Sequence, residues 1–539
     1  MTVNIANRIT EQAQAQPDAI AISIPLAGRG TDRPYHSLTF RELEADIDSA
    51  ARGFLDIGIK RGDRVSVFVK PGLELVSICF ALYKIGAVVV LIDPGMGRDG
   101  LLSCIERIAP TALIGIPKAM VATLLFGKKF RSVRIKVTVG WGAWLWGGYR
   151  YRKVKSSDVS PLECVSTTGS DEASILFTSG STGPAKGVQY THGIFEAQTD
   201  HIQKMYGIEA GEIDLPCFPM FGLFSLAMGM RIVIPDMDAT KVAQADPKTL
   251  VDAIKQHNIT NAFASPALWR PFVKWCLQND IQLPTLRRIL SAGAPIPPSL
   301  HKDFQQILAD GVEVFTPYGA TESLPVASIG SLEVLDDTQF QTARGNGTCV
   351  GSLAPNLTAK IIAISDEPIA NWDEVTLLAQ GDIGEICVQG PVVTKEYKEE
   401  PEQTRLAKIY DSQGQHWHRM GDLGYFDEQG RLWFCGRKSH RVQCTDQTLM
   451  FPVPCESIFN QHPSIHRSAL VDVDGAPVLV VECEKNQSIT EEELHDIAQK
   501  HEKTARIKRF LLHPSFPVDV RHNAKIHRLQ LRDWAKTQP

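Results

Sequence analysis

The sequence predicts an α/β protein with more than one domain. Segments with helical spacing of apolar residues alternate with short apolar strands, a pattern typical of helices packed on a largely parallel sheet. The chain has 539 residues, too many for a single compact core, so we expect at least two domains. Hydrophobic residues make up 43 % of the chain and charged residues 22 %, as in ordinary globular proteins.

The alternation begins near the N-terminus. Residues 42–57 place Leu43, Ile47, Ala50 and Phe54 on one helical face, and a glycine follows. The same pattern then predicts a strand at 64–70, a helix at 73–85, a strand at 87–92, a helix near 101–108 and a strand at 112–116.

Composition excludes several classes of function. The formal net charge of −5 gives no reason to expect a nucleic-acid partner. The 11 cysteines show no paired spacing, so neither a disulfide framework nor a zinc site is indicated. The first 20 residues lack the apolar core of a signal peptide, and no stretch reaches the ~18 apolar residues of a membrane span. We therefore expect a cytoplasmic protein without a transmembrane span.

A glycine- and hydroxyl-rich loop follows the predicted strand at 173–177. Glycines let backbone amides approach an anion closely, hydroxyls add donors, and Lys186 adds a cation, so the loop is suited to phosphate. A flexible surface loop is the alternative reading. The usual nucleotide P-loop is excluded, because Lys186 is followed by Gly187 rather than by Ser or Thr. The candidate ATP-binding residues of this loop are Thr178, Ser179, Gly180, Ser181, Thr182 and Gly183.

Two apolar stretches each allow two readings. Residues 141–155 contain five Trp and Tyr residues beside four cations, which suits an aromatic β-hairpin or a surface that docks a partner or a membrane. Residues 216–230 hold three Phe and three Met, which suits either core or a pocket for an alkyl chain. For the acyl pocket, the candidates are Phe221, Gly222 and Met228. Between these stretches, Thr191 is a predicted N-cap for a helix over 192–206.

Three further motifs follow predicted strands. A turn at Gly293, Ala294 and Pro295 could lie flat against a planar base. Residues 314–323 combine an aromatic ring, a glycine, a hydroxyl and a carboxylate suited to Mg²⁺; these are Tyr318, Gly319, Thr321 and Glu322. Near 418–437, Asp422 could accept ribose hydroxyls, and a turn at 427–430 leads to Arg437. Taken alone, each of these residues could be structural.

Together these motifs resemble those of the acyl-adenylate-forming superfamily, which includes acyl-CoA synthetases and fatty acyl-AMP ligases. The resemblance implies that Tyr318 stacks on adenine, Thr321 contacts phosphate, Glu322 holds Mg²⁺, and Asp422 and Arg437 bind ribose. The tail also fits, with Lys525 and Arg528 matching the family's terminal Lys-x-x-Arg although Ala524 replaces a glycine. Without the resemblance, Lys525 would be predicted to be an ordinary solvent-exposed lysine. The resemblance makes it the catalytic cation between the carboxylate and the α-phosphate, alongside Lys186.

The resemblance also implies the domain organisation. A large N-terminal ATP- and acyl-binding domain with mixed sheets (1–436) precedes a small mobile α+β domain (437–539) that carries Lys525. The hinge falls at Ser439, whose small polar side chain suits changes in backbone dihedrals. Phe221 stands where the family usually has a histidine, so the identity of the residue at that gate is open.

Over nearly the full length, segments at 92–98, 114–117 and 517–526 resemble the β-lactone synthetases of bacterial long-chain olefin biosynthesis. This implies ATP and Mg²⁺, a long-chain 2-alkyl-3-hydroxyalkanoic acid as substrate, and assembly with other olefin-pathway enzymes. Residues 442–451 lack the glycine usual in members that use CoA, which agrees with internal attack by the substrate's hydroxyl. A fatty acyl-AMP ligase, an acyl-CoA synthetase and an inactive acyl-binding scaffold are the alternatives. His192 is a candidate base for ring closure or a structural histidine.

Overall fold

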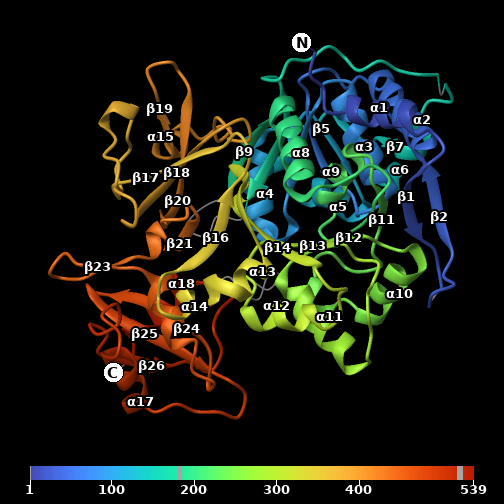
Figure 1. Ribbon diagram of the computed structural model, residues 1–539. Coiled ribbons are helices and arrows are strands. Elements are labelled where there is room, and N and C mark those ends of the chain that lie inside the picture. Colours follow the sequence, from blue (N-terminus) through green and yellow to red (C-terminus); the bar gives the residue numbers. More distant parts are fainter. Residues whose placement is uncertain (1, 29, 159, 179–184, 519–525, 539) are drawn as a thin grey trace.

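The computed structural model describes residues 2–28, 30–158, 160–178, 185–518 and 526–538. The N-terminal part is built on two large sheets, and a smaller domain begins after residue 440 (Figure 1). Within the described residues, no helix is long and apolar enough to cross a membrane.

The first sheet contains the predicted alternation of helices and strands. Its strand order is β7-β6-β5-β3-β4-β8-β9, and every pair is parallel except β8 with β9. Adjacent residues face opposite sides: Val89 packs with α2 and α3, whereas Val90 packs with α4 and α5. The predicted parallel sheet is therefore confirmed. Its strands are β3 (Arg64–Phe68), β4 (Val88–Ile92), β5 (Ala112–Gly115), β6 (Ile135–Thr138), β7 (Tyr149–Arg150), β8 (Glu172–Thr178) and β9 (Lys186–Thr191).

Helix α8 of the N-terminal part begins where its local signal predicts. Thr191 caps α8 by accepting a hydrogen bond from the backbone N–H of Ile194, as expected. The helices are α1 (Asn7–Ala15), α2 (Phe40–Asp56), α3 (Leu73–Lys84), α4 (Gly97–Ile108), α5 (Pro117–Leu125), α6 (Ala143–Trp146), α7 (Tyr151–Val154), α8 (His192–Tyr206), α9 (Phe221–Ala227), α10 (Pro247–His257), α11 (Pro266–Gln278), α12 (Pro298–Gln305), α13 (Ser331–Glu333), α14 (Gln339–Ala343) and α15 (Pro401–Ala407).

The aromatic segment at 141–155 is not a β-hairpin. It forms the short helices α6 and α7 around β7, and β7 pairs with β6 in the parallel direction. Trp146 and Tyr151 are buried, and the Trp146 indole donates to the Thr138 hydroxyl at 2.9 Å. Trp141 and Trp144 stay exposed. The glycines at 140, 142, 147 and 148 all have positive φ, which breaks the chain into turns where strands were expected.

The second sheet is mixed and passes through the rest of the N-terminal part. Its order is β17-β18-β20-β21-β16-β15-β14-β13-β12-β10-β11-β1-β2, with β19 on β20. Strands β10 to β14 run parallel and the hairpin β14–β15 is antiparallel. The strands are β1 (Ile20–Pro25), β2 (Tyr35–Thr39), β10 (Ile213–Pro216), β11 (Arg231–Val233), β12 (Asn261–Ala264), β13 (Arg288–Ser291), β14 (Glu313–Ala320), β15 (Ser323–Gly330), β16 (Thr348–Leu353), β17 (Thr358–Ile362), β18 (Gly384–Gln389), β19 (Lys408–Tyr410), β20 (His416–Phe426) and β21 (Leu432–Arg437).

The C-terminal domain has hydrophobic clusters of its own, built from residues 442 and beyond. Its elements are β22 (Val442–Gln443), β23 (Leu449–Met450), β24 (Ile465–Val473), β25 (Ala476–Cys483), β26 (Arg509–Leu512), α16 (Pro452–Phe459), α17 (Glu491–Gln499) and α18 (Arg528–Lys536). Lys503 joins the domain to the N-terminal part through hydrogen bonds to the Gly345 carbonyl at 2.6 Å and Asn346 Oδ1 at 2.9 Å.

Gly53 sets the distance between α2 and α7. A Cβ at this position would lie 1.9 Å from the Val154 carbonyl oxygen, so Gly53→Ala must push the backbone apart. We expect Gly53→Ala to lower the free energy of unfolding by about 1–3 kcal/mol. Urea unfolding followed by circular dichroism measures it. Gly127→Ala is the matched control, because a Cβ there meets nothing within 4 Å. An unchanged midpoint for Gly53→Ala would contradict this close packing.

Candidate active site

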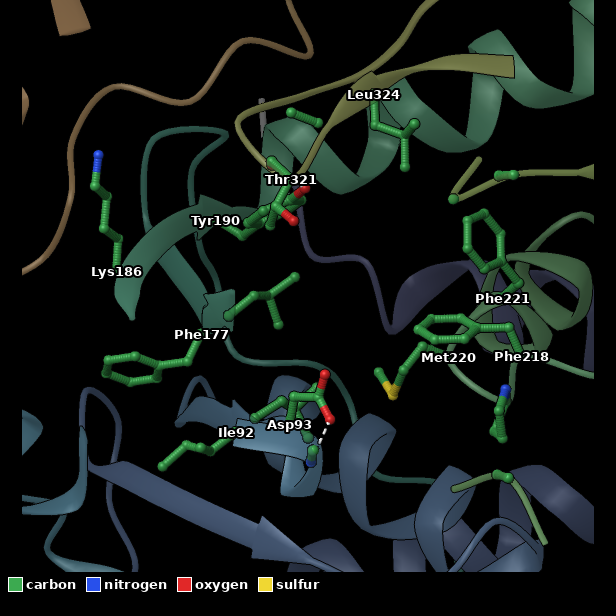
Figure 2. A pocket seen from close by; sticks show the side chains of 18 of the residues that line it. Ile92, Asp93, Phe177, Lys186, Tyr190, Phe218, Met220, Phe221, Thr321 and Leu324 are labelled. Carbon is green, nitrogen blue, oxygen red and sulfur yellow. Dashed lines mark hydrogen bonds between the residues drawn. The ribbon is translucent and has the colours of Figure 1, made fainter. Parts of the chain in front are cut away.

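A cavity of about 2250 Å³ lies between the two sheets and reaches the start of the C-terminal domain. Its wall includes the ends of several strands, the loop before α9, part of α5, and residues 437–439. Figure 2 shows Lys186 and Thr321 toward one end of the cavity and Met220 and Phe221 toward the other. The cavity thus has a polar end and an apolar arm.

The turn between β14 and β15 supplies two polar groups to the wall. Ala320 pairs with Ser323, so Thr321 and Glu322 form a two-residue connection at the tip of an antiparallel hairpin. The Tyr190 hydroxyl donates to the Thr321 carbonyl at 2.5 Å and fixes this tip. The β14–β15 hairpin therefore presents a hydroxyl and a carboxylate at the cavity.

Tyr397 connects this turn with Lys186, and nothing in its sequence neighbourhood marked it as functional. Its hydroxyl donates to Glu322 Oε1 at 2.7 Å, and the Lys186 ammonium lies 4.8 Å from the centre of its ring. Burial and the Glu322 charge raise the pKa of Tyr397 well above its usual value, so the hydroxyl remains a donor at neutral pH. The residue reaches the site because a single antiparallel bridge joins it to Val188.

Asp422 and Arg437 face each other across the hairpin of β20 and β21. Arg437 Nη1 lies 3.0 Å from Asp422 Oδ1, and the Tyr318 hydroxyl donates to Asp422 Oδ2 at 2.7 Å. The carboxylate is buried, and burial raises its pKa although Arg437 acts in the opposite direction. Oδ1 has no hydrogen bond within the described residues. Arg437 lines the cavity, whereas Tyr318 and Asp422 do not, so only one of these three predicted nucleotide-binding residues lies at the wall.

The turn after β13 gives the cavity a flat backbone surface. Gly293 lines the cavity with a φ of +92°, a conformation that side-chain-bearing residues rarely adopt. Ala294 and Pro295 continue the turn but do not line the cavity. Of the three predicted residues, the structure therefore brings Gly293 to the site.

The apolar arm corrects the predicted acyl pocket. Phe221 lines the arm and stacks on Phe263, with ring centres 3.8 Å apart and 18° between the planes. Gly222 and Met228 do not line it: Gly222 lies against Pro216, and Met228 is buried in a core cluster. Residues 216–230 thus form both pocket and core, because α9 presents one face to the cavity and the opposite face to the sheet.

Asp93 is a cavity residue whose own role the sequence did not indicate. It follows β4, lines the cavity, and accepts a hydrogen bond from the Gly95 N–H at 2.8 Å (Figure 2). His192, by contrast, is absent from the wall. Its Nδ1 accepts the Ile5 N–H at 3.2 Å, and burial lowers its pKa to about 4. This geometry gives His192 a structural role.

Several predicted residues lie outside the described part of the chain. These are Ser179, Gly180, Ser181, Thr182, Gly183 and Lys525. Thr178, at the end of β8, pairs through its backbone with Lys186. Val518 and His527, which stand on either side of the stretch that contains Lys525, line the cavity. The hinge candidate Ser439 lines it as well.

The chain is similar to proteins of known family and fold. Residues 9–398 match the family described as AMP-binding enzyme. A protein of Stenotrophomonas maltophilia named olefin β-lactone synthetase is 44 % identical, covering 99 % of this chain and 98 % of its own. A protein of the same name from Xanthomonas campestris pv. campestris is 43 % identical with the same coverage. The O-succinylbenzoate coenzyme A synthetase of Bacillus subtilis, solved with AMP, superposes with a TM-score of 0.75 at 21 % identity over 98 % of each chain.

Asp422→Asn tests the assignment of the buried carboxylate. An amide removes the negative charge and one acceptor, so we expect AMP to bind about 10- to 100-fold more weakly, a loss of about 1–3 kcal/mol. Isothermal titration calorimetry with AMP measures the change. Asp382→Asn, an exposed carboxylate away from the cavity wall, should leave the affinity unchanged. Equal AMP affinity in Asp422→Asn and the unmodified chain would remove Asp422 from the nucleotide site.

Proposed function

This chain belongs to the AMP-binding enzyme family, whose members are adenylate-forming ligases that use ATP, and we propose that it converts a long-chain 2-alkyl-3-hydroxyalkanoic acid into a β-lactone. The observation that carries the proposal is the identity of 43–44 %, over almost the full chain, to two proteins named olefin β-lactone synthetase. The cavity supports it, because a polar end for nucleotide continues into an apolar arm for alkyl chains.

The reaction has two steps. In the first, a carboxylate oxygen of the acid attacks the α-phosphorus of ATP, and pyrophosphate leaves. In the second, the substrate's own β-hydroxyl oxygen attacks the acyl carbonyl carbon, loses its proton, and displaces AMP. A cavity that holds hydroxyl and carbonyl together makes the second step a proximity reaction, and no external thiol is required.

We assign the nucleotide to the polar end. Asp422 and Arg437 bind the ribose, Gly293 and Tyr318 flank the adenine, and Thr321 contacts phosphate. The glycine- and hydroxyl-rich composition of residues 178–183 assigns that loop to the phosphates, together with Lys186. Charge on the phosphates is offset by Lys186 in the first step, and Lys525 acts on the carboxylate and the α-phosphate.

Mg²⁺ fits this site as a companion of the nucleotide. Glu322 is a single carboxylate at the cavity wall, and the described residues contain no cluster of three acidic, His or Cys ligands. Mg²⁺ commonly takes one or two protein carboxylates and completes its shell with phosphate oxygens and water. When bound it would neutralise phosphate charge. The Tyr397 hydroxyl orients Glu322 for this contact.

Residues 437–539 are proposed to rotate about Ser439 between the two steps. Ser439 lies in a 3₁₀ turn, Lys438–His440, which ion pairs hold on both sides. Lys438 contacts Glu385 at 3.1 Å and Arg441 contacts Asp366 at 2.5 Å. The hydrophobic clusters of the two parts separate here, between residues 434 and 442. We further propose a cytoplasmic location and assembly with other enzymes of an olefin pathway.

The acyl-CoA synthetase reading is the second candidate. The glycine-free stretch after the hinge, in which β22 pairs with β23, argues against it, because pantetheine usually passes a glycine there. Incubation with ATP, Mg²⁺ and a synthetic 2-alkyl-3-hydroxy fatty acid, without CoA, separates the two. We expect AMP and β-lactone in equal amounts by mass spectrometry. An acyl-AMP that turns over only after a thiol is added would establish the ligase instead.

Lys525→Ala tests the catalytic lysine. Loss of a cation that offsets charge in the transition state should slow AMP formation by roughly 10²–10³-fold. Release of pyrophosphate gives the rate, and Lys485→Ala, an exposed lysine of the same domain, is the control. A Lys525→Ala protein that keeps the full rate would exclude this role. Loss of AMP formation with the fold intact would rule out an inactive scaffold.

A further inference from the structure

Exposed apolar side chains are concentrated in one region of the N-terminal domain. Among the described residues, eighteen large hydrophobic side chains are exposed, and seven of them fall between residues 121 and 149. Trp144 is 83 % exposed, Leu125 71 % and Trp141 68 %. The seven, which we call the exposed patch, are Val121, Leu124, Leu125, Trp141, Trp144, Leu145 and Tyr149.

Packing brings the members of the exposed patch together. α5 contacts both α6 and β6, and β7 lies beside β6 at the edge of the first sheet. The ring centres of Trp141 and the buried Trp146 are 6.5 Å apart, so the exposed Trp141 indole packs next to a buried indole. Figure 1 places α6 and β7 on the opposite side of the molecule from the C-terminal domain. A rotation of that domain would therefore leave the patch uncovered.

The segment that carries the exposed patch is basic. Residues 117–155 contain ten lysines and arginines and no acidic residue, in a chain whose net charge is −5. Two of the ten form ion pairs with carboxylates in the described chain, Lys129 with Glu106 and Lys155 with Asp46. Seven are exposed: Lys118, Lys128, Arg131, Arg134, Arg150, Arg152 and Lys153.

The helix α5 belongs both to the exposed patch and to the cavity wall. Lys118, Ala119 and Ala122 line the cavity, whereas Leu124 and Leu125 point to solvent. Phe126, at the end of α5, also lines the cavity. One helix thus separates the acyl-binding cavity from the apolar surface, so whatever covers this surface lies next to the cavity.

We propose that the exposed patch docks on an anionic lipid bilayer. Trp and Tyr side chains prefer the interface between headgroups and acyl chains, and clustered lysines and arginines are attracted to anionic headgroups. Seven exposed cations in the same segment as the exposed Trp and Leu side chains match that chemistry. If the proposed function holds, docking also places α5 against the bilayer that dissolves the long-chain hydroxy acid. The substrate then enters the cavity beside this helix.

Co-sedimentation of the purified full chain with vesicles tests docking. We expect binding to vesicles of equal parts phosphatidylglycerol and phosphatidylcholine, and roughly tenfold less to phosphatidylcholine alone. Binding should weaken with salt, because screening shortens the reach of the cations. No ATP or acid is present, so the outcome is independent of the proposed function. Absence of binding, or equal binding to both vesicles, would overturn the proposal.

Matched variants locate the surface. Trp144→Ser with Leu125→Ser should reduce vesicle binding roughly tenfold, because the most exposed apolar groups are gone. Leu332→Ser with Phe340→Ser, two exposed residues on other elements, should not. Both variants should keep the activity of the unmodified chain on substrate in detergent. Vesicle binding that survives Trp144→Ser with Leu125→Ser contradicts the proposal. A change from dimer to monomer without lipid, seen by analytical ultracentrifugation, would assign the patch to a second copy instead.

Discussion

The ion pair of the buried Asp422 carboxylate with Arg437, whose side chain is 37 % exposed, is the constraint on which the rest of the site depends. A buried carboxylate without a charged or hydrogen-bonding partner would be costly. The pair joins three elements, because Tyr318 of β14 also donates to Asp422. Arg437 stands two residues before Ser439, the proposed hinge, so this contact lies next to the boundary between the two parts of the chain.

The second polar centre lies at the tip of the β14–β15 hairpin. Glu322, Tyr397 and Lys186 form a chain of contacts across three segments, β15's turn, the loop before α15 and β9. The Tyr397 ring contacts the Lys186 ammonium, and the Tyr397 hydroxyl orients the Glu322 carboxylate. Lys186 and Thr321 lie toward one end of the cavity and Phe221 toward the other, so the polar groups of this centre are separated from the apolar arm (Figure 2).

The first sheet differs between its buried inner strands and its exposed edge at β7. Its inner strands are buried on both faces, which explains their continuous apolar runs. At the edge, β7 contributes two residues, and glycine turns replace a longer strand. Short, cation-rich edges discourage pairing with another sheet. The same glycine turns leave Trp141 and Trp144 exposed to solvent. The glycines therefore both shorten the edge strand and expose these aromatic side chains.

By itself the sequence determined what depends on neighbours along the chain. Helical spacing, the Thr191 cap, the β20–β21 turn and the strand-then-glycine motifs are local signals, and they predicted the parallel sheet and several residues of the cavity wall, among them Lys186, Thr321 and Glu322. Tertiary structure alone decided the rest. Tyr397 meets Glu322 from 75 positions away, and α9 turns Phe221 toward the cavity while Gly222 lies against Pro216 of β10. Such contacts follow from how elements pack, and packing of distant segments leaves no periodic mark in the sequence.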